Sequence, residues 1–374
     1  MDYVKLKDVC KINMGQSPDS DSYNDNGHGV PFFQGNADFG ERYPITRKWC
    51  SAPNKMAAPE DILISVRAPI GAMNYAKEEC CIGRGLAALT PNRAKVSSEY
   101  IFWLLKGKNE ELNSKGTGST FKAIGRNILE ETLVPDISLE KQTECSIILE
   151  KVYRVILSRK QQLQKLDELV KARFIELFGD PISNPKGWKK DKAESHIDLL
   201  SGYPFQSEQY VNDGINICGG LIIMPQKIQW QDCRHWPSVD GYEDYLLAED
   251  DIVMALDRPW ISEGFKIAQV DSTHLPALLI QRTARIRGID VNQQYLFHCF
   301  VNGGFDKHCN VTGSLVPHIS AKDIRSFEIL LPPIKLQKQF AAFVKQVDKS
   351  KVAVQKALDE TQLLFDSLMQ KYFE

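Results

Sequence analysis

The chain has 374 residues, of which 43% are hydrophobic and 25% are charged. This composition is typical of a folded globular protein of two or three domains and excludes wholesale disorder. The 46 Lys and Arg residues nearly balance the 48 Asp and Glu residues, so the net charge of −2 argues against a small, strongly basic nucleic-acid binder. The segment Met1–Lys7 has no apolar core of a secretory signal, and no apolar run approaches the ~20 residues of a membrane span. We therefore expect a cytoplasmic protein that does not enter a membrane.

Nine cysteines are scattered without a Cys-x-x-Cys pair, so neither a disulfide framework nor a zinc ribbon is indicated. The most metal-like group is His298-Cys299 with His308-Cys309. Its spacing matches no standard zinc pattern, and Cys299 follows an apolar run. We expect these side chains to pack in the core and to hold no metal.

Two mixed, turn-rich regions alternate with two long helical patterns along the chain. Residues 1–137 contain short strand-like runs such as Ile62–Val66, and Pro135 ends this region. A helical pattern covers residues 138–180 and stops at Gly179-Asp180-Pro181. A second mixed region covers residues 188–333, and a second helical pattern covers residues 334–374.

The helical patterns predict one apolar stripe on each long helix. The second helix has 4–3 spacing with two polar interruptions, and the first is less regular. A helix of ~40 residues spans about 60 Å, so we expect two exposed coiled-coil arms that pair antiparallel. The predicted stripe residues are Ile148, Val152, Val155, Leu163, Leu166, Val170, Phe174 and Leu177 in the first helix, and Phe340, Val344, Val347, Lys351, Val354, Leu358, Thr361, Phe365, Leu368 and Tyr372 in the second.

An internal repeat relates the two halves of the chain. Four patches recur in the same order, at offsets of 190, 195, 195 and 197 residues, as expected for two copies that differ by small insertions. The pairs are Asp61–Pro69 with Asp251–Pro259, Tyr100–Trp103 with Tyr295–His298, Gly118–Ile124 with Gly313–Ile319, and Leu133–Gln142 with Leu331–Gln339, in which Gln142 aligns with Gln339.

The motifs of common catalytic sites are missing. There is no Gly-x-x-x-x-Gly-Lys-Ser/Thr loop, and Gly83-Arg84-Gly85 lacks the third glycine of a dinucleotide fingerprint. No Asn-Pro-Pro-aromatic element of amino-methyltransferases and no Ser/His/Asp grouping occurs in the sequence. We expect a chain without a catalytic site.

The sequence resembles the specificity (S) subunit of type I restriction-modification systems over nearly its whole length. The segments that carry this resemblance are Glu60–Gly71, the Gly116–Thr120 loop leading into Ile124, Leu133–Pro135 with Glu140–Gln142, and Lys165–Pro181. The second copy differs from this motif, because Asp257-Arg258-Pro259-Trp260 stands in place of Arg67-Ala68-Pro69-Ile70.

The resemblance implies an α+β fold with two tandem mixed α/β target recognition domains separated by two long antiparallel coiled-coil helices. Residues 1–137 and 188–333 would each read one half of a bipartite, asymmetric site in double-stranded DNA. The helices 138–180 and 334–374 would act as spacers and dock two methyltransferase (M) subunits, with restriction (R) subunits completing the complex. S-adenosylmethionine, ATP and Mg are expected on those partners, and no cofactor is expected on this chain.

Candidate DNA contacts in the first copy fall into three groups. A glycine-spaced loop offers amides, hydroxyls and lysines for phosphate contacts, with a solvated turn as the alternative. Two arginines could read guanine edges, with structural ion pairs as the alternative, and a third group could read adenine. These groups are Lys115, Thr117, Ser119, Thr120 and Lys122; Arg67 and Arg84; and Gln34, Asn36 and Arg42.

In the second copy the counterparts are Arg258, Trp260, Lys266 and Arg282, with Thr312 and Ser314 in the repeated loop. Trp230 and Trp236 are expected to pack, because readout of duplex DNA does not require stacking. Two other functions stay open: a coiled-coil scaffold whose mixed domains bind proteins and have no DNA specificity, and an enzyme with an unrecognised site. A duplex mobility shift separates DNA recognition from both.

Overall fold

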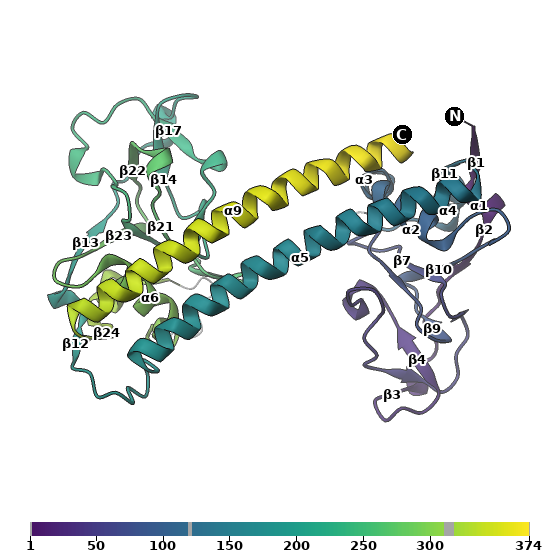
Figure 1. Ribbon diagram of the computed structural model, residues 1–374, viewed down its shortest axis with the longest axis horizontal. Helices are drawn as coiled ribbons and strands as arrows, with labels where there is room; N and C mark the ends of the chain where they lie inside the picture. The colour runs from purple at the N-terminus through teal and green to yellow at the C-terminus, as the bar shows by residue number, and fades with distance from the viewer. Residues whose placement is uncertain (1, 119–121, 310–317, 374) are drawn as a thin grey trace. The chain divides into compact units, whose positions relative to one another are not determined.

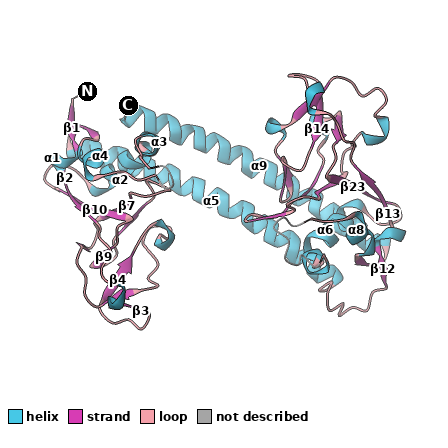
Figure 2. Cartoon of the chain, turned by 180° about the vertical axis from the view of Figure 1, so that it is seen from behind, coloured by secondary structure: helices cyan, strands magenta, loops and turns pink. Residues whose placement is uncertain are grey.

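The computed structural model describes residues 2–118, 122–309 and 318–373 (Figure 1). The predicted contacts Ser119, Thr120, Thr312 and Ser314 lie outside the described residues. Contacts divide the chain into two compact units, Met1–Gln161 with Gln355–Glu374, and Gln162–Val354. Both units combine helices and strands (Figure 2), so the predicted mixed α and β content is confirmed.

The first unit contains two sheets and a small strand pair. An antiparallel sheet has the order β2 (Cys10–Met14), β10 (Leu86–Pro91), β7 (Ile62–Ser65), β8 (Met73–Tyr75). The second sheet has the order β3 (Tyr23–Asn24), β5 (Trp49–Cys50), β4 (Val30–Phe33), β9 (Cys80–Ile82), β6 (Met56–Ala57), with β4 and β9 parallel. Both views place the β3–β4–β9 region farther from α5 than β7 and β10 (Figures 1 and 2).

The first unit also contains four short helices and a strand pair. They are α1 (Leu6–Val9), α2 (Ser98–Gly107), α3 (Asn109–Ser114) and α4 (Arg126–Glu130), and β1 (Tyr3–Lys5) pairs with β11 (Leu133–Pro135). The Ser97 side chain caps α2 by accepting a hydrogen bond from the Tyr100 amide at 3.1 Å.

The second unit repeats this plan. Its antiparallel sheet has the order β13 (Ile197–Ser201), β23 (Thr283–Gly288), β18 (Ile252–Ala255), β21 (Ile267–Gln269). A second sheet has the order β17 (Arg234–Trp236), β14 (Ile215–Cys218), β22 (Ala277–Leu279), with β14 and β22 parallel. The strands β12 (Lys190–Lys192) and β24 (Glu328–Leu330) form a pair. Two hairpins follow: β15 (Ile223–Met224) with β16 (Lys227–Ile228), and β19 (Trp260–Ile261) with β20 (Gly264–Phe265). The short helices are α6 (Gln293–Asn302), α7 (Phe305–His308) and α8 (Ala321–Ser326).

Buried hydrogen bonds confirm the repeat. The Tyr100 hydroxyl donates to the Pro135 carbonyl at 3.3 Å, and the Tyr295 hydroxyl donates to the Leu330 carbonyl at 2.9 Å. The buried Gln142 side chain accepts from the Ser97 amide and donates to the Ile137 carbonyl, while Gln337 makes the same two bonds to Asn292 and Pro332. The predicted pairing of Gln142 with Gln339 is therefore wrong, because Gln337 occupies the equivalent buried position.

Two 40-residue helices, α5 (Leu139–Phe178) and α9 (Ile334–Phe373), each begin in one unit and end in the other. In the first unit Tyr153 of α5 contacts Phe365 of α9, with ring centroids 5.8 Å apart. In the second unit Asp167 pairs with Lys351 at 2.6 Å, and Phe174 contacts Phe340 at 5.5 Å. Within the second unit, rising residue numbers in α5 meet falling numbers in α9, so the two helices run antiparallel there.

The predicted stripe of α9 is the less exposed face of that helix, with Phe340, Val344, Val347, Leu358 and Phe365 buried. The stripe of α5 is correct at Val170 and Phe174 but wrong at Val155, which is 43% exposed. Its neighbour Ile156 is 1% exposed and takes the inward position. A one-residue error of this kind arises because α5 packs against short helices as well as against α9.

The predicted core packing of His298 and Cys299 is confirmed. His298 is 5% exposed and lies against Phe174, Phe297 and Phe340. Burial lowers the pKa of the His298 imidazole to about 3, assisted by the positive charge of Lys351. Among the described residues, no three metal-ligating side chains lie close enough to hold an ion, and no helix is long and apolar enough to cross a membrane.

The buried imidazole predicts an acid-sensitive stability. The folded pKa of His298 lies below the unfolded value of 6.5, so its contribution is fully present above pH 6.5 and is lost as the pH falls toward 3. Each pH unit in that window costs about 1.4 kcal/mol. Between pH 7 and pH 5, urea denaturation should show that wild-type protein loses about 2 kcal/mol more unfolding free energy than the His298→Gln variant.

His28→Gln is the matched control, because His28 is exposed. It should lose as much stability on acidification as the wild type. Equal losses in the wild type and in the His298→Gln variant would contradict a buried neutral imidazole.

Candidate nucleic-acid interface

Three segments of the first unit meet through main-chain hydrogen bonds. The Gly83 amide donates to the Phe33 carbonyl at 2.8 Å, and the Val66 amide donates to the Gly85 carbonyl at 2.9 Å. Segment 83–85 thus lies between the ends of β4 and β7. A Cβ atom at residue 85 would lie 2.3 Å from the Gln34 carbonyl oxygen, so this close approach requires glycine. The geometry brings Gln34, Arg67 and Arg84 to one surface.

The loop after α3 adds its own groups to this surface. The Thr117 and Ala123 amides exchange hydrogen bonds at 3.0 and 2.9 Å with each other's carbonyls. The Lys122 carbonyl accepts from the Ala68 amide at 3.0 Å, and the Val66 carbonyl accepts from the Ile124 amide at 2.9 Å. We call the resulting set the first surface: Gln34, Asn36, Arg67, Arg84, Lys115, Thr117 and Lys122.

The first surface is polar and carries excess positive charge. Its members are exposed except Asn36, which is half-buried. Lys115 pairs with Glu111 at 2.5 Å. The Asp38 carboxylate accepts from the Gln34 amide at 2.8 Å and so fixes the backbone that presents Gln34. Such a set of donors suits phosphates and base edges.

Ser17 joins the first surface and was missed in the sequence. Its hydroxyl accepts a hydrogen bond from the Arg84 amide at 3.4 Å, and the adjacent Gln16 amide donates to the Ile82 carbonyl at 3.0 Å. No local pattern marks these residues, because their partners lie more than 60 positions away.

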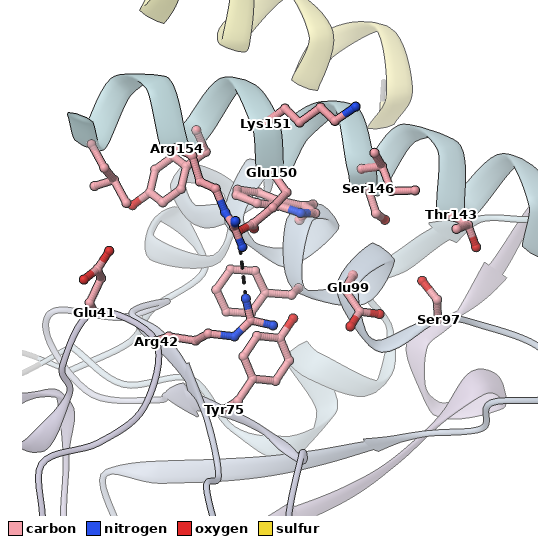
Figure 3. A pocket seen from close by; sticks show the side chains of 15 residues that line it. Glu41, Arg42, Tyr75, Ser97, Glu99, Thr143, Ser146, Glu150, Lys151 and Arg154 are labelled. Carbon is pink, nitrogen blue, oxygen red and sulfur yellow. Dashed lines mark hydrogen bonds and ion pairs between the residues drawn. The ribbon is translucent and has the colours of Figure 1, made fainter. Parts of the chain in front are cut away.

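Arg42 lies apart from the other predicted first-copy contacts. Its guanidinium lies over the Tyr75 ring at 5.2 Å and pairs with Glu150 of α5 at 3.8 Å. Figure 3 shows Arg42 and Arg154 pointing toward Glu150, in a cavity of about 730 Å³ beside α2 and α5. The structure therefore does not bring Arg42 together with Gln34 and Asn36.

The second unit builds an equivalent surface with different side chains. The Leu256 amide donates to the Arg282 carbonyl at 2.9 Å, and Asp257 forms a β-bridge with His318. Asp257 is also an ionic partner: its Oδ2 lies 3.1 Å from Arg282 Nη1, and its Oδ1 lies 2.6 Å from His318 Nδ1. We call Asp257, Arg258, Arg282 and His318 the second surface.

Sequence reasoning found Arg258 and Arg282 but missed Asp257 and His318. Asp257 falls at the repeat offset of 190 residues from Arg67. His318 falls 195 residues after Ala123, which bridges Arg67 in the same way. Following the repeat offset position by position would have found both residues.

Two other predicted second-copy contacts are less accessible. Lys266 is 7% exposed, its ammonium donates to the Gly220 carbonyl, and burial lowers its pKa. A buried lysine already bonded to the main chain cannot reach DNA, so the expectation for Lys266 is corrected. Trp260 is half-buried in the β19–β20 hairpin and stacks on Phe265 at 5.3 Å.

The expected packing of Trp230 and Trp236 is confirmed. They are 6% and 5% exposed, respectively. The Trp230 indole donates to Asp271 Oδ2 at 2.9 Å, and Trp236 lies in an aromatic cluster with Phe205 and Tyr242.

Comparison with known proteins agrees with the internal repeat, because one family matches two separate stretches of the chain. Residues 1–168 and 238–361 match the family described as type I restriction modification DNA specificity domain. The putative type I restriction enzyme MjaX specificity subunit of Methanocaldococcus jannaschii is 40% identical over 161 residues, which cover 43% of this chain and 38% of that protein. The aligned part therefore spans well under half of that relative.

Two other relatives match over most of their length. The type I restriction enzyme MjaIX specificity subunit of the same organism is 24% identical over 99% of this chain and 92% of its own. The crystal structure of the S subunit of the type I restriction-modification system from M. genitalium superimposes with a TM-score of 0.60 at 13% identity, covering 100% of this chain and 96% of that one, and so shares its fold. Because the family match covers most of the chain and includes parts of both copies of the repeat, the chain belongs to the type I restriction-modification DNA specificity family.

Proposed function

We propose that this chain is the DNA sequence-specificity subunit of a type I restriction-modification complex. Residues 1–137 and 188–333 act as target recognition domains, and each reads one half of a bipartite, asymmetric site. The observation that carries this proposal is a shared main-chain scaffold that presents different side chains. The bond from Val66 to Gly85 recurs from Leu256 to Arg282, while the side chains around it are exchanged.

Charge on the two surfaces supports DNA as the ligand. Arg67, Arg84 and Lys122 are exposed cations on a chain whose net charge is −2, so positive charge is local. Phosphate neutralisation by a few such groups gives binding that is weak for the isolated chain and dependent on salt. Partner subunits that enclose the duplex would share the remaining phosphate contacts.

The long helices form the spacer and the docking surface for two M subunits, with R subunits bound in the complete complex. Large apolar side chains exposed along both helices support this assignment, because covering them with a partner removes apolar surface from water. They include Ile147 and Leu169 of α5, at 50% and 47% exposure, and Val352 and Leu363 of α9, at 69% and 70%.

Catalysis resides on the partners in this proposal. The chain recognises DNA and contributes no reacting group, while S-adenosylmethionine, ATP and Mg bind to the M and R subunits. The complex acts in the cytoplasm. A mobility shift of duplex DNA with and without the M subunit tests the proposal, and a complex that binds all duplexes equally would favour a protein-binding scaffold.

Two predicted contact lysines, one exposed and one buried, give a paired test. Lys122→Ala removes one exposed cation, so it should weaken DNA binding for all sequences and reduce the salt slope of log K by about 1, with unchanged stability. Lys266→Ala removes a buried side chain and its bond to Gly220. It should lower the unfolding free energy by about 1–3 kcal/mol and leave the salt slope unchanged.

Fluorescence anisotropy at several salt concentrations measures the slope, and urea denaturation measures the stability. A lower salt slope for Lys266→Ala in a folded protein would contradict the assignment of Lys266 to the core.

The modular plan predicts independent half-sites. Replacing residues 188–333 with the corresponding region of a relative of different specificity should change one half-site and leave the other intact. Sequencing of methylated adenines after co-expression with the M subunit measures this. Simultaneous change of both half-sites would rule out two independent readers.

A further inference from the structure

We propose that Arg282 and Asp257 form a reading site for one G·C base pair in the half-site recognised by the second copy, with His318 as a positioning residue. This inference rests on the proposed function. It assigns a base pair to a site built by three residues from separate stretches of the chain.

The geometry of the pair leaves part of the guanidinium available. Arg282 is 74% exposed at its side chain, and its Nη1 lies 3.1 Å from Asp257 Oδ2. The Nη2 and Nε edge of the same planar group can therefore donate two parallel hydrogen bonds. Guanine presents two acceptors, O6 and N7, side by side in the major groove, which is the pattern that a free guanidinium edge matches.

Asp257 makes the site selective for a base pair over a phosphate. Its carboxylate is partly exposed and would repel a phosphate next to Arg282. A carboxylate also accepts from the N4 amino group of cytosine, the partner of guanine. Arg282 and Asp257 together therefore present donors and an acceptor in the order that complements a G·C pair.

His318 holds the carboxylate from its other side. His318 Nδ1 lies 2.6 Å from Asp257 Oδ1, and the two residues form a β-bridge. Asp257 is thus restrained by its own backbone and by two side chains. A restrained carboxylate restrains Arg282 in turn, which limits the rotamer entropy that Arg282 loses on binding.

Backbone conformation supports a functional role for this cluster. Arg282 and Arg258 adopt positive φ angles of 63° and 46°, a region unfavourable for residues with a Cβ atom. In the first copy the scaffold carries Gly85 where the second carries Arg282, and Arg67 where it carries Asp257. The same two positions of the shared main-chain scaffold therefore carry different side chains in the two copies.

Methylation of a randomised duplex pool by the complex of this chain with its M subunit and S-adenosylmethionine tests the inference. The wild type should require guanine at one position of one half-site. Arg282→Ala should relax that preference by about 10- to 100-fold and leave the other half-site unchanged. Arg282→Lys should restore affinity more than selectivity, because an ammonium lacks the planar fork.

Substitution of 7-deazaguanine at the same position removes the N7 acceptor. This replacement should weaken methylation by the wild-type complex and leave methylation by the Arg282→Ala complex unchanged. Asp257→Asn should relax selectivity at this position alone, an effect that a purely structural role would not produce. Arg325→Ala, which removes an exposed arginine on α8, is the matched control. The complex with this variant should methylate the same DNA sequence as the wild type.

The outcomes separate the two proposals. A wild-type complex that methylates without sequence preference would overturn the proposed function and this inference with it. A selective wild type whose specificity survives Arg282→Ala, or falls equally at all positions, would overturn the inference alone. Retention of the first half-site in each variant shows that the protein is folded.

Discussion

One main-chain hydrogen bond in each copy holds the candidate interface together: Val66 to Gly85 in the first unit and Leu256 to Arg282 in the second. Each bond ties the end of a central strand to the segment that leads into its neighbour, and the end of a parallel strand contacts that segment from the other side. Because the bond uses only backbone atoms, it does not itself dictate the side chains, although the approach of the Gln34 carbonyl requires glycine at residue 85 in the first copy. The same frame can therefore carry Arg67 beside Gly85, or Asp257 beside Arg282.

A second constraint connects each frame to its long helix. The buried amides of Gln142 and Gln337 bond the first turns of α5 and α9 to the segments that cap α2 and α6. Buried polar groups of this kind are costly to leave unpaired, so they fix the geometry of the joint. The first turns of α5 and α9 are thereby bonded firmly to the mixed region that precedes each helix. The residues of the first and second surfaces take no part in this joint.

The repeat made much of the fold predictable from the sequence. The strand at Ile62–Val66, its counterpart near residue 252, and both long helices follow from patterns that depend on neighbouring residues. Positions that depend on distant contacts were harder to predict. Val155 and Ile156 differ by one position in α5, and the choice between them is made by the helices packed against α5. Lys266 resembles any surface lysine until the Gly220 carbonyl is placed beside its ammonium.

The candidate site also contains residues that local sequence could predict and residues whose positions depend on distant contacts. Arg67, Arg84 and Arg282 were found because cations next to strand ends are local features. Asp257, His318 and Ser17 were missed because their roles come from partners far along the chain, and Arg42 was grouped with Gln34 because they are close in sequence. In space Arg42 turns toward Tyr75 and Glu150 instead. Sequence proximity is a weak guide where short strands separate the loops.

Hydrogen exchange of the reconstituted complex, with and without a duplex that carries its methylation site, tests most directly that both copies read DNA through this frame. The account predicts slower exchange in peptides covering residues 66–68 and 83–85 and, in the same complex, in peptides covering residues 256–258 and 280–282. A duplex with a scrambled sequence should give weaker protection at all four. Protection confined to one copy, or to α5 and α9 alone, would contradict two readers built on one scaffold.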